Sequence, residues 1–477
     1  MRAILAALAL LTLLAALPGG PAGPFDARSG APVEGFRLEF SRSAALFEPF
    51  LAVGHALGGA PDHRAAILSS LVWLVLLTAA FGYFRSRGGR RSRGRSGPAA
   101  GGAALGAAVC FAGYVLLLLL ARPPSWRLVS DSGDYLLADL QSHTYASHDG
   151  IVSPGENLRL HADHGYDVVA VTEHEDSFGA HIAEEFSALD PDLPAVVPGV
   201  ELREQGGGYL LGLGAHLRRE WITPQGLRSA EKFCAFLHEK DRAGAVVALS
   251  WKLQPEDAAR LADAGVDGFE IANYGHPALP EPVRDALLSV ARERGRILAA
   301  SSDWHGWGGS WRTWTAIRIP GARSLNRAQR AAAVVEALRT RRAEDIIPVT
   351  AGRLGTPSTL RAVFAPFAES FRYARELSLP RVMSWWLWLG ALWGIAALLR
   401  RHGRVPSWTL GAAALGIGAV GLLLCGEGLI EARLLGAAAS GFSLEIGVWA
   451  CVAGVVLAAG SLAAFRRSAA PLEGTRR

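Results

Sequence analysis

Residues 138–176, ADLQSHTYASHDGIVSPGENLRLHADHGYDVVAVTEHED, decide the fold. An apolar run from Tyr135 to Leu140 leads into them and is typical of a buried strand. A loop follows, then a helix whose start is indicated by Ser153-Pro154, and then a second apolar run, 167–171, which ends in Thr172-Glu173-His174. This order predicts strand, loop, helix and strand. Polar side chains stand at the end of each strand, where parallel barrels gather ligand and catalytic groups.

Polar residues alternate along the first of these strands. Asp139, Gln141 and His143 are spaced two residues apart. Because side chains i and i+2 of a strand share a face, we expect all three to point toward one centre. Asp303 and His305 have the same spacing after a later apolar run. The sequence therefore predicts one polar site assembled from several strand ends.

The region 122–380 alternates strand-like and helical patterns. Helical patterns cover 227–239, 255–264, 283–292 and 328–341. Further strand-like runs cover 195–201, 209–214, 245–249, 268–272, 297–301 and 315–319. Strands that alternate with helices at this spacing predict βαβ units around a parallel sheet. The helix at 328–341 is expected to close the domain.

Four short motifs in this region resemble those of the PHP (polymerase and histidinol phosphatase) superfamily. The family patterns Asp-Leu-His-x-His-Thr, Thr-Asp-His, Gly-x-Glu and Ser-Asp-x-His are matched, in order, by residues 139–144, 172–174, 199–201 and 302–305. Each motif is weak alone, but all four follow strand-like runs in the family order. The resemblance covers roughly residues 127–350. It implies an α/β fold, a distorted (β/α)7 TIM-like PHP barrel, joined here to transmembrane helices.

The resemblance also implies a site for divalent metals at the strand ends. Histidine nitrogen together with carboxylate oxygen suits Zn, Mn or Fe without choosing among them. Glu201 is expected to bridge metals, and Asp303 or His305 to orient the attacking water or take its proton, so these three are the catalytic candidates. Carried over position by position, the metal ligands are His143, either His148 or Asp149, His174, Glu201, Asp303 and His305.

Three family histidines are replaced in this chain. Gln141, Tyr209 and Ser250 stand at those positions, and a neutral glutamine oxygen is a weak ligand. We therefore expect one or two ions rather than three. His276 follows a predicted strand and could supply a replacement ligand.

Other polar and aromatic residues have simpler interpretations. Lys252 and Arg203 follow strand ends, where surface charge is the simpler interpretation and phosphate binding the alternative. A cluster of tryptophans is expected to pack in the core, to wall the pocket or to face lipid headgroups: Trp304, Trp307, Trp311 and Trp314. Solvated positions are expected for the remaining histidines of the domain: His161, His164, His181, His216 and His238.

Composition indicates a membrane protein. Half of the 477 residues are hydrophobic, and the mean hydropathy is +0.22. Apolar segments near the roughly 20 residues that a spanning helix needs cover 66–84, 102–121, 382–399, 409–426 and 446–465. Residues 1–23 are typical of a signal peptide or an N-terminal anchor. The four cysteines predict neither a disulfide framework nor a CxxC zinc motif.

Arginines mark one side of the predicted spans. The loop 85–98, the residues after 399 and the tail 466–477 are basic. Short basic flanks of membrane helices face the cytoplasm, which explains this charge without a nucleic-acid partner. Threading the spans then places residues 24–65 and the barrel outside the cytoplasm, at a bacterial inner membrane. Residues 351–381 are expected to be a linker.

These inferences lead to one prediction of function. The resemblance implies a membrane-anchored phosphoesterase that hydrolyses a phosphomonoester or phosphodiester by metal-bound hydroxide, because a metal lowers the pKa of its bound water. The expected partners are the membrane and a small phosphorylated substrate, or the headgroup of a lipid or glycan. The alternative is a degenerate PHP domain that binds a ligand without turnover and signals to its spans. The replaced histidines leave that alternative open.

Overall fold

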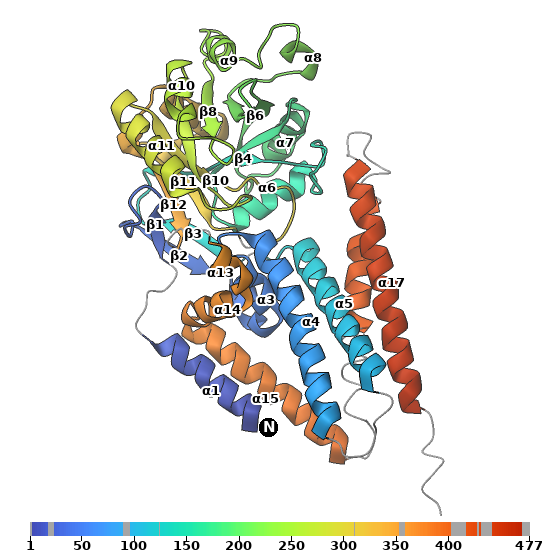
Figure 1. The fold of residues 1–477 in the computed structure, drawn as a ribbon. Coiled ribbons are helices and arrows are strands. Elements are labelled where there is room, and N and C mark those ends of the chain that lie inside the picture. The colour runs from blue at the N-terminus through green and yellow to red at the C-terminus, as the bar shows by residue number, and fades with distance from the viewer. Residues whose placement is uncertain are drawn as a thin grey trace, which may run out of the picture.

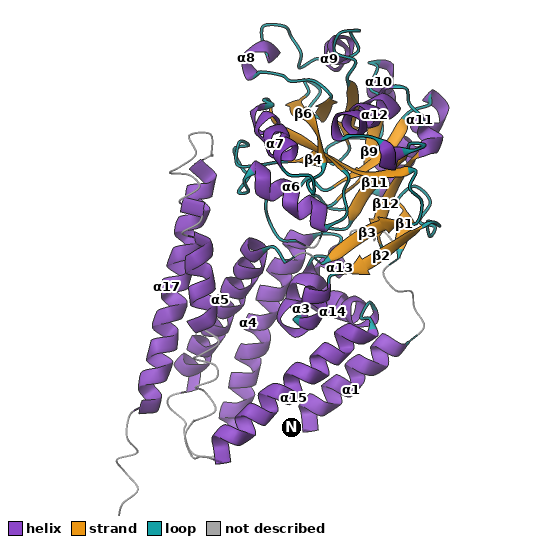
Figure 2. Ribbon diagram, turned by 180° about the vertical axis from the view of Figure 1, so that it is seen from behind, coloured by secondary structure: helices purple, strands orange, loops and turns teal. Residues whose placement is uncertain are grey.

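A curled sheet flanked by helices lies at one end of a bundle of long helices (Figure 1). The structure is a computed structural model that describes residues 2–17, 23–88, 96–123, 125–309, 311–352, 358–401, 416–426, 429–430 and 441–469. Helices surround the sheet on its outer side, and the long helices extend away from it (Figure 2). The chain therefore combines a mixed α/β part with a helical part, as the sequence predicts.

Ten strands form the main sheet, in the order β1-β12-β11-β4-β5-β6-β7-β8-β9-β10. Their bounds are β1 Pro24–Asp26, β4 Tyr135–Ser142, β5 Val168–His174, β6 Ala195–Arg203, β7 Tyr209–Leu213, β8 Ala245–Leu249, β9 Gly268–Asn273, β10 Ile297–Ser301, β11 Thr313–Arg318 and β12 Ile346–Ala351. The sequence predicted β8 and β10 to the residue and β4 to β7, β9 and β11 within three residues.

The expectation of a purely parallel sheet is wrong. β4, β5 and β6 are parallel, as are β8, β9 and β10, but β7 is antiparallel to both of its neighbours and β11 is antiparallel to β4 and β12. The loop 204–208 between β6 and β7 is too short for the crossover that a parallel pair requires. A short connection therefore decides the direction of β7.

The sheet curls until β10 lies against β11. Thr313 Oγ1 donates to the carbonyl of Ser301 (2.8 Å), and the N–H of Ala300 donates to Thr315 Oγ1 (2.9 Å). The interior is filled by buried aliphatic side chains from the strands of the sheet and from α12. The result is a barrel-like α/β fold with the carboxyl ends of its parallel strands at one edge.

Helices α6 Pro154–Asp163, α7 Phe178–Leu189, α8 Arg219–Ile222, α9 Ala230–Leu237, α10 Asp257–Asp263, α11 Glu281–Arg294 and α12 Arg327–Arg339 connect these strands. The predicted start of α6 is confirmed, because Ser153 Oγ accepts a hydrogen bond from the N–H of Glu156 (3.2 Å) and Pro154 follows it. The expectation that the helix at 328–341 closes the domain is wrong, since β12 follows it and lies between β1 and β11.

The segment before α4 belongs to the fold. β1 pairs with β12, and β2 (Phe36–Phe40) pairs with β3 (Trp126–Ser130) in a small second sheet. Two helices follow β2: α2 Arg42–Leu46 and α3 Glu48–Leu57. The predicted linker 351–381 holds α13 Thr359–Val363 and α14 Ala365–Arg375. Both regions are thus structured parts of the junction between sheet and bundle.

The long helices are α4 His63–Gly88, α5 Ser96–Ala121, α15 Leu379–Arg401 and α17 Gly441–Ala469. In the described part of the chain, three helical segments are long and apolar enough to cross a membrane: His63–Phe84, Ala104–Ala121 and Leu444–Leu462. They coincide with predicted spans 66–84, 102–121 and 446–465. The predicted span 382–399 is helical within α15, whereas of 409–426 only the short apolar helix Gly416–Gly426 lies inside the described residues.

The long helices run between the sheet and the far end of the bundle. α4 begins near the sheet and α15 begins beside α14; both end away from the sheet, at Gly88 and Arg401, and α5 runs back toward it (Figure 1). α1 (Arg2–Ala16), the predicted signal peptide or anchor, packs against α15, where Trp386 Nε1 donates to Thr12 Oγ1 (3.0 Å). The arginine-rich flanks thus follow the helix ends that are farthest from the sheet.

Candidate metal centre

Hydrogen bonds between strand ends bring the sequence motifs together. The N–H of His143 donates to the carbonyl of Trp304 (2.8 Å), and the N–H of Asp303 donates to the carbonyl of Gln141 (2.9 Å). On the neighbouring strands β5 and β6, His174 and Glu201 are register partners. Motifs that are far apart in the sequence therefore end at one edge of the sheet.

The most buried part of the site contains His143, Glu201 and Asp303. Their side chains are at most 5% exposed. Nε2 of His143 lies 3.2 Å from Oε2 of Glu201 and 3.2 Å from Oδ1 of Asp303. Nδ1 of the same ring lies 3.2 Å from Ser147 Oγ. One ring nitrogen thus faces two carboxylates.

A second group lies beside the first and is half-buried. Nε2 of His174 lies 3.2 Å from Oδ1 of Asp149, and Nε2 of His305 lies 3.4 Å from Oδ2 of the same carboxylate. The ring of His143 stacks on His305 at 4.1 Å and on His174 at 4.6 Å between centroids. Of the two competing ligands, Asp149 lies between these histidines, whereas His148 is 76% exposed at the outer side, 3.8 Å from Asp149 Oδ2.

Several ligand atoms lack the hydrogen bonds that buried polar atoms need. Nε2 of His143, Nε2 of His174 and Oδ1 of Asp149 are buried and form no hydrogen bond of normal geometry in the described part of the chain. Such an atom costs about 1–3 kcal/mol when left unpaired. Ligand atoms gather within 4.8 Å of one another in three sets: His143, His174, His305; His148, Asp149, His174; and His143, Glu201, Asp303. The side chains present therefore fit a divalent transition metal.

Acids and bases of the site shift in opposite directions. Burial opposes the imidazolium of His143, but the carboxylates of Asp303 and Glu201 outweigh it and hold the pKa of His143 well above its ordinary value. Burial also opposes ionised Asp149 and Asp303, yet neighbouring histidines hold both pKa values below the ordinary range. The carboxylates are therefore ionised, and protonated histidines balance their negative charge. A bound cation would take over this charge balance.

The backbone at Asp303 is strained. Its φ is +50°, in the left-handed region that residues with a side chain seldom adopt. Gly275 approaches so closely that a Cβ there would lie 3.0 Å from the carbonyl and carboxylate oxygens of Asp303. Strain of this kind is retained where the surroundings fix it, often at functional sites. Here it turns the Asp303 carboxylate toward His143.

The three replaced histidines do not supply equivalent ligands. Gln141 Nε2 donates to Oε2 of Glu201 (2.7 Å), so this amide orients a carboxylate. Tyr209 lines the cavity of the site and stacks on Trp251, with 5.2 Å between ring centroids. Ser250 is buried and lines a neighbouring cavity. That the site holds one or two metal ions rather than three therefore remains a prediction, and these contacts favour it.

Sequence reasoning missed part of the site. Nε2 of His276, considered only as a replacement ligand, lies 3.0 Å from Oδ2 of Asp303, and its ring stacks on Trp251 at 4.0 Å. Glu270 on β9 is fully buried and accepts from Nδ2 of Asn273 (3.0 Å), and burial raises its pKa well above the ordinary value. An acidic residue in the middle of an apolar strand was the signal that could have found it.

The expectation that His161 and His164 face solvent is wrong, because both side chains are fully buried. Nδ1 of His164 bonds the carbonyl of Leu160 (2.7 Å) and its Nε2 the carbonyl of Gly309 (2.9 Å). Its ring stacks on Trp311 at 4.0 Å. This face of α6 lies against the tryptophan cluster, which excludes water. Solvated positions are confirmed for His181 and His216, and His238 is 28% exposed beside Asp267.

Asp139 was expected to point toward the centre, but it lies behind it. His161 Nε2 lies 2.8 Å from Oδ2 of Asp139, and the N–H of Ser302 donates to Oδ1 (2.9 Å). The hydroxyl of Ser302 also donates to the same carboxylate. Asp139 and His161 therefore position the loop that carries Asp303 and His305.

The tryptophans and the two cations have different environments. Core packing is confirmed for three tryptophans, which are at most 2% exposed: Trp304, Trp311 and Trp314. Trp307 lines the cavity and packs against the apolar cluster of α5 and α17. Arg203 lines the cavity, whereas the Lys252 ammonium lies 4.3 Å above the ring of Trp251.

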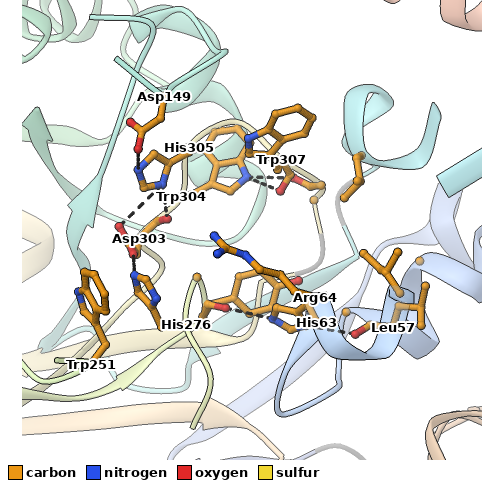
Figure 3. A pocket seen from close by; sticks show the side chains of 18 of the residues that line it. Leu57, His63, Arg64, Asp149, Trp251, His276, Asp303, Trp304, His305 and Trp307 are labelled. Atoms are coloured by element: carbon orange, nitrogen blue, oxygen red, sulfur yellow. Dashed lines mark hydrogen bonds and ion pairs between the residues drawn. The ribbon is translucent and has the colours of Figure 1, made fainter. Parts of the chain in front are cut away.

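The site opens into a cavity of about 1060 Å³. Figure 3 shows Asp149, His305 and Asp303 along one wall, with Trp251 and His276 beneath them and Arg64 and His63 of α4 across the space. A cavity of this size holds a drug-sized molecule. The site therefore has room for a substrate as well as metal.

No family model and no curated protein matches the chain. Among solved structures, it is similar to a protein assigned as a metal-dependent phosphoesterase from Bifidobacterium adolescentis (19% identity, 36% of this chain, 88% of that chain, TM-score 0.29). It is also similar to an amidohydrolase from Chromobacterium violaceum with bound sulfate and no metal (15% identity, 35% of this chain, 87% of that chain, TM-score 0.29). A third similar structure is PsfC from Pseudomonas syringae (15% identity, 51% of this chain, 100% of that chain, TM-score 0.30). These likenesses are too distant to show a family, so the chemistry of the chain is inferred from its own residues.

Proposed function

We propose that this chain is a membrane-anchored, metal-dependent phosphoesterase of the PHP type. The observation that carries the proposal is the set of buried ligand atoms on His143, His174 and Asp149 that form no hydrogen bond of normal geometry in the described residues and gather with two more carboxylates at the strand ends. A bound cation would offset the cost of burying these charged groups together. The same residues match the PHP motifs in the sequence.

The side chains divide the work between two halves of the site. Glu201 has Oε2 3.2 Å from His143 and Oε1 3.6 Å from His174, so one carboxylate faces both halves. A divalent metal held here by the three ligand sets would make its water more acidic and neutralise charge on a phosphoryl oxygen. Asp303 or His305 would orient the attacking water or take its proton, as the resemblance implies. The cation of Arg203 would hold the phosphate.

We place the site outside the cytoplasm. The supporting observations are the basic flanks of the spans and the direction of α4, α5 and α15, whose arginine-rich ends lie away from the sheet. The substrate would then be a phosphomonoester or phosphodiester at the outer face of the membrane.

The test uses the purified full-length protein, loaded with Mn or Zn, and an aryl phosphodiester. Metal content and hydrolysis are measured for the wild type, Asp303→Asn and Glu201→Gln. Both variants keep the side-chain shape and remove a negative ligand, so each is expected to lose metal and most turnover. Wild-type protein that binds no metal would contradict the proposal.

A non-catalytic sensor is the second candidate, and one observation favours it. The loops of the site are bonded directly to the ends of two long helices: Gly308 N–H donates to the carbonyl of Leu119 (2.7 Å), and His63 Nε2 lies 3.0 Å from the carbonyl of Tyr274. Movement of these loops on ligand binding would reach α4 and α5. Metal binding without turnover in the wild type would select this candidate.

A further inference from the structure

The cavity of the site has two chemically different ends. One end is lined by the metal-type ligands Asp149, His174, Glu201, Asp303 and His305. The other end is lined by aliphatic side chains of three helices: Val53 and Leu57 of α3, Ile67 of α4, and Val115, Leu118 and Leu119 of α5. Apolar lining favours an apolar part of a ligand, because it removes that part from water.

The apolar end coincides with the sheet-side ends of two candidate membrane spans. Ile67 lies one turn into α4, and Val115 lies two turns before the end of α5. At a rise of about 1.5 Å per residue, these side chains reach roughly 6–9 Å along the spans. This depth corresponds to the headgroup layer and the first part of the acyl chains of a bilayer.

Backbone contacts fix the distance between the two ends. Gly308, three residues after His305, is bonded to the carbonyl of Leu119 at the end of α5. Arg122 follows α5, and its Nε donates to the carbonyl of Gly306 (2.6 Å). The metal-type ligands are thus held at one spacing from the membrane helices, so the cavity is suited to one molecule that spans both ends.

Two arginines, Arg64 and Arg203, line the cavity. Arg64, in the first turn of α4, extends into the cavity on the side of His276 and Asp303 (Figure 3). Arg64 and Arg203 form no ion pair within the part of the chain that the structure describes. Unpaired arginines at a membrane surface attract anionic headgroups, and they are suited to phosphate oxygens.

We propose that the ligand of this cavity is a membrane lipid with a phosphate headgroup, whose phosphate reaches the metal-type ligands while its acyl part lies against α3, α4 and α5. The proposal rests on the proposed function for its chemistry: hydrolysis of such a lipid adds water across a P–O bond and releases an alcohol and a phosphate. A water-soluble phosphoester would leave the aliphatic end of the cavity in contact with water.

The experiment compares two p-nitrophenyl phosphodiesters that differ in the second alcohol, methyl or octyl, on metal-loaded full-length protein. The ratio of kcat/KM for octyl over methyl is expected to exceed tenfold, since each methylene that leaves water contributes at most about fourfold. Ile67→Trp fills the apolar end and should lower this ratio at least tenfold. Leu68→Trp is the matched control, because Leu68 is 63% exposed and does not line the cavity.

A binding measurement separates this proposal from the proposed function. Native mass spectrometry should show dioctanoyl phosphatidic acid retained by the wild type and by Leu68→Trp, and lost from Ile67→Trp. Leu118→Trp fills the same end from α5 and should match Ile67→Trp, which excludes a folding defect peculiar to one variant. Equal octyl-to-methyl ratios in all proteins, with no lipid retained, would overturn the lipid proposal and leave the phosphoesterase. If the wild type retained the lipid but hydrolysed neither ester, the lipid site would stand and the phosphoesterase would be overturned.

Discussion

Replacement of His161 by alanine tests how the centre is supported. His161 is fully buried, and its Nε2 lies 2.8 Å from Oδ2 of Asp139. Removing one partner of a buried pair costs about 3–5 kcal/mol, and losing a hydrogen bond to a charged group costs about 1.5–3 kcal/mol. Ser302 still donates to Asp139 in the variant. We therefore expect His161→Ala to lower the free energy of unfolding by about 3 kcal/mol, the value at which the two ranges meet. That is a large share of the roughly 5–15 kcal/mol that stabilises a typical domain.

The assay is denaturant unfolding of the full-length protein, followed by tryptophan fluorescence, because Trp311 lies 5.0 Å from the His161 ring. The matched control is His181→Ala: its side chain is 62% exposed and pairs with Glu185 only at 3.7 Å. A surface pair of this kind contributes about 0–1 kcal/mol.

The same change should also weaken metal binding. Asp139 positions Ser302, which directly precedes Asp303, and loss of such an outer partner typically costs about 10- to 100-fold in metal affinity. Competition with a chelator measures this. If His161→Ala unfolded at the wild-type denaturant concentration and bound metal as tightly as His181→Ala, the supporting role of His161 would be refuted.

Three further changes test other parts of the structure. Burial opposes the charge of Glu48, but His55 and Arg381 outweigh it and lower the pKa of Glu48 from 4.5 to about 2. The ionised carboxylate therefore stabilises the fold above pH 4.5, and this contribution is lost as the pH falls toward 2; circular dichroism during acid titration should show a flatter response in Glu48→Gln. His276→Ala should weaken metal binding by about 10- to 100-fold, and chelator competition showing no change would exclude it from the centre. A reporter fused at Gly97 should be cytoplasmic, and one fused at Ser324 should be external. Signals from the same side of the membrane at both positions would contradict the topology.

Local patterns determined most elements of the barrel-like part. β8 and β10 are short apolar runs between turn residues, and they have the predicted bounds because a buried strand needs little more than that pattern. The start of α6 followed from a serine and a proline that act on the backbone within one turn. β12 was missed because Pro348, which lacks an N–H, argues against a strand.

The residues of the centre were predicted where a motif carries them, and missed where it does not. Asp303 and His305 are two positions apart, so the strand period places them together before any fold is known. His276 and Glu270 belong to no such motif, and only the approach of β9 to β10 brings them beside Asp303. The spacing of His161 and His164 identified a helix face, but whether water or Trp311 covers that face depends on packing.

The sequence by itself determined the ligand types, their order on the strands and the apolar spans, because each depends on neighbours within a few residues. Only the tertiary structure decided that Asp139 supports the centre from behind and that the cavity of the centre continues onto α3, α4 and α5. These features depend on contacts between residues that are often a hundred or more positions apart, such as Gly308 with Leu119. No local period encodes such contacts, since they arise from the closure of the sheet against the helix ends.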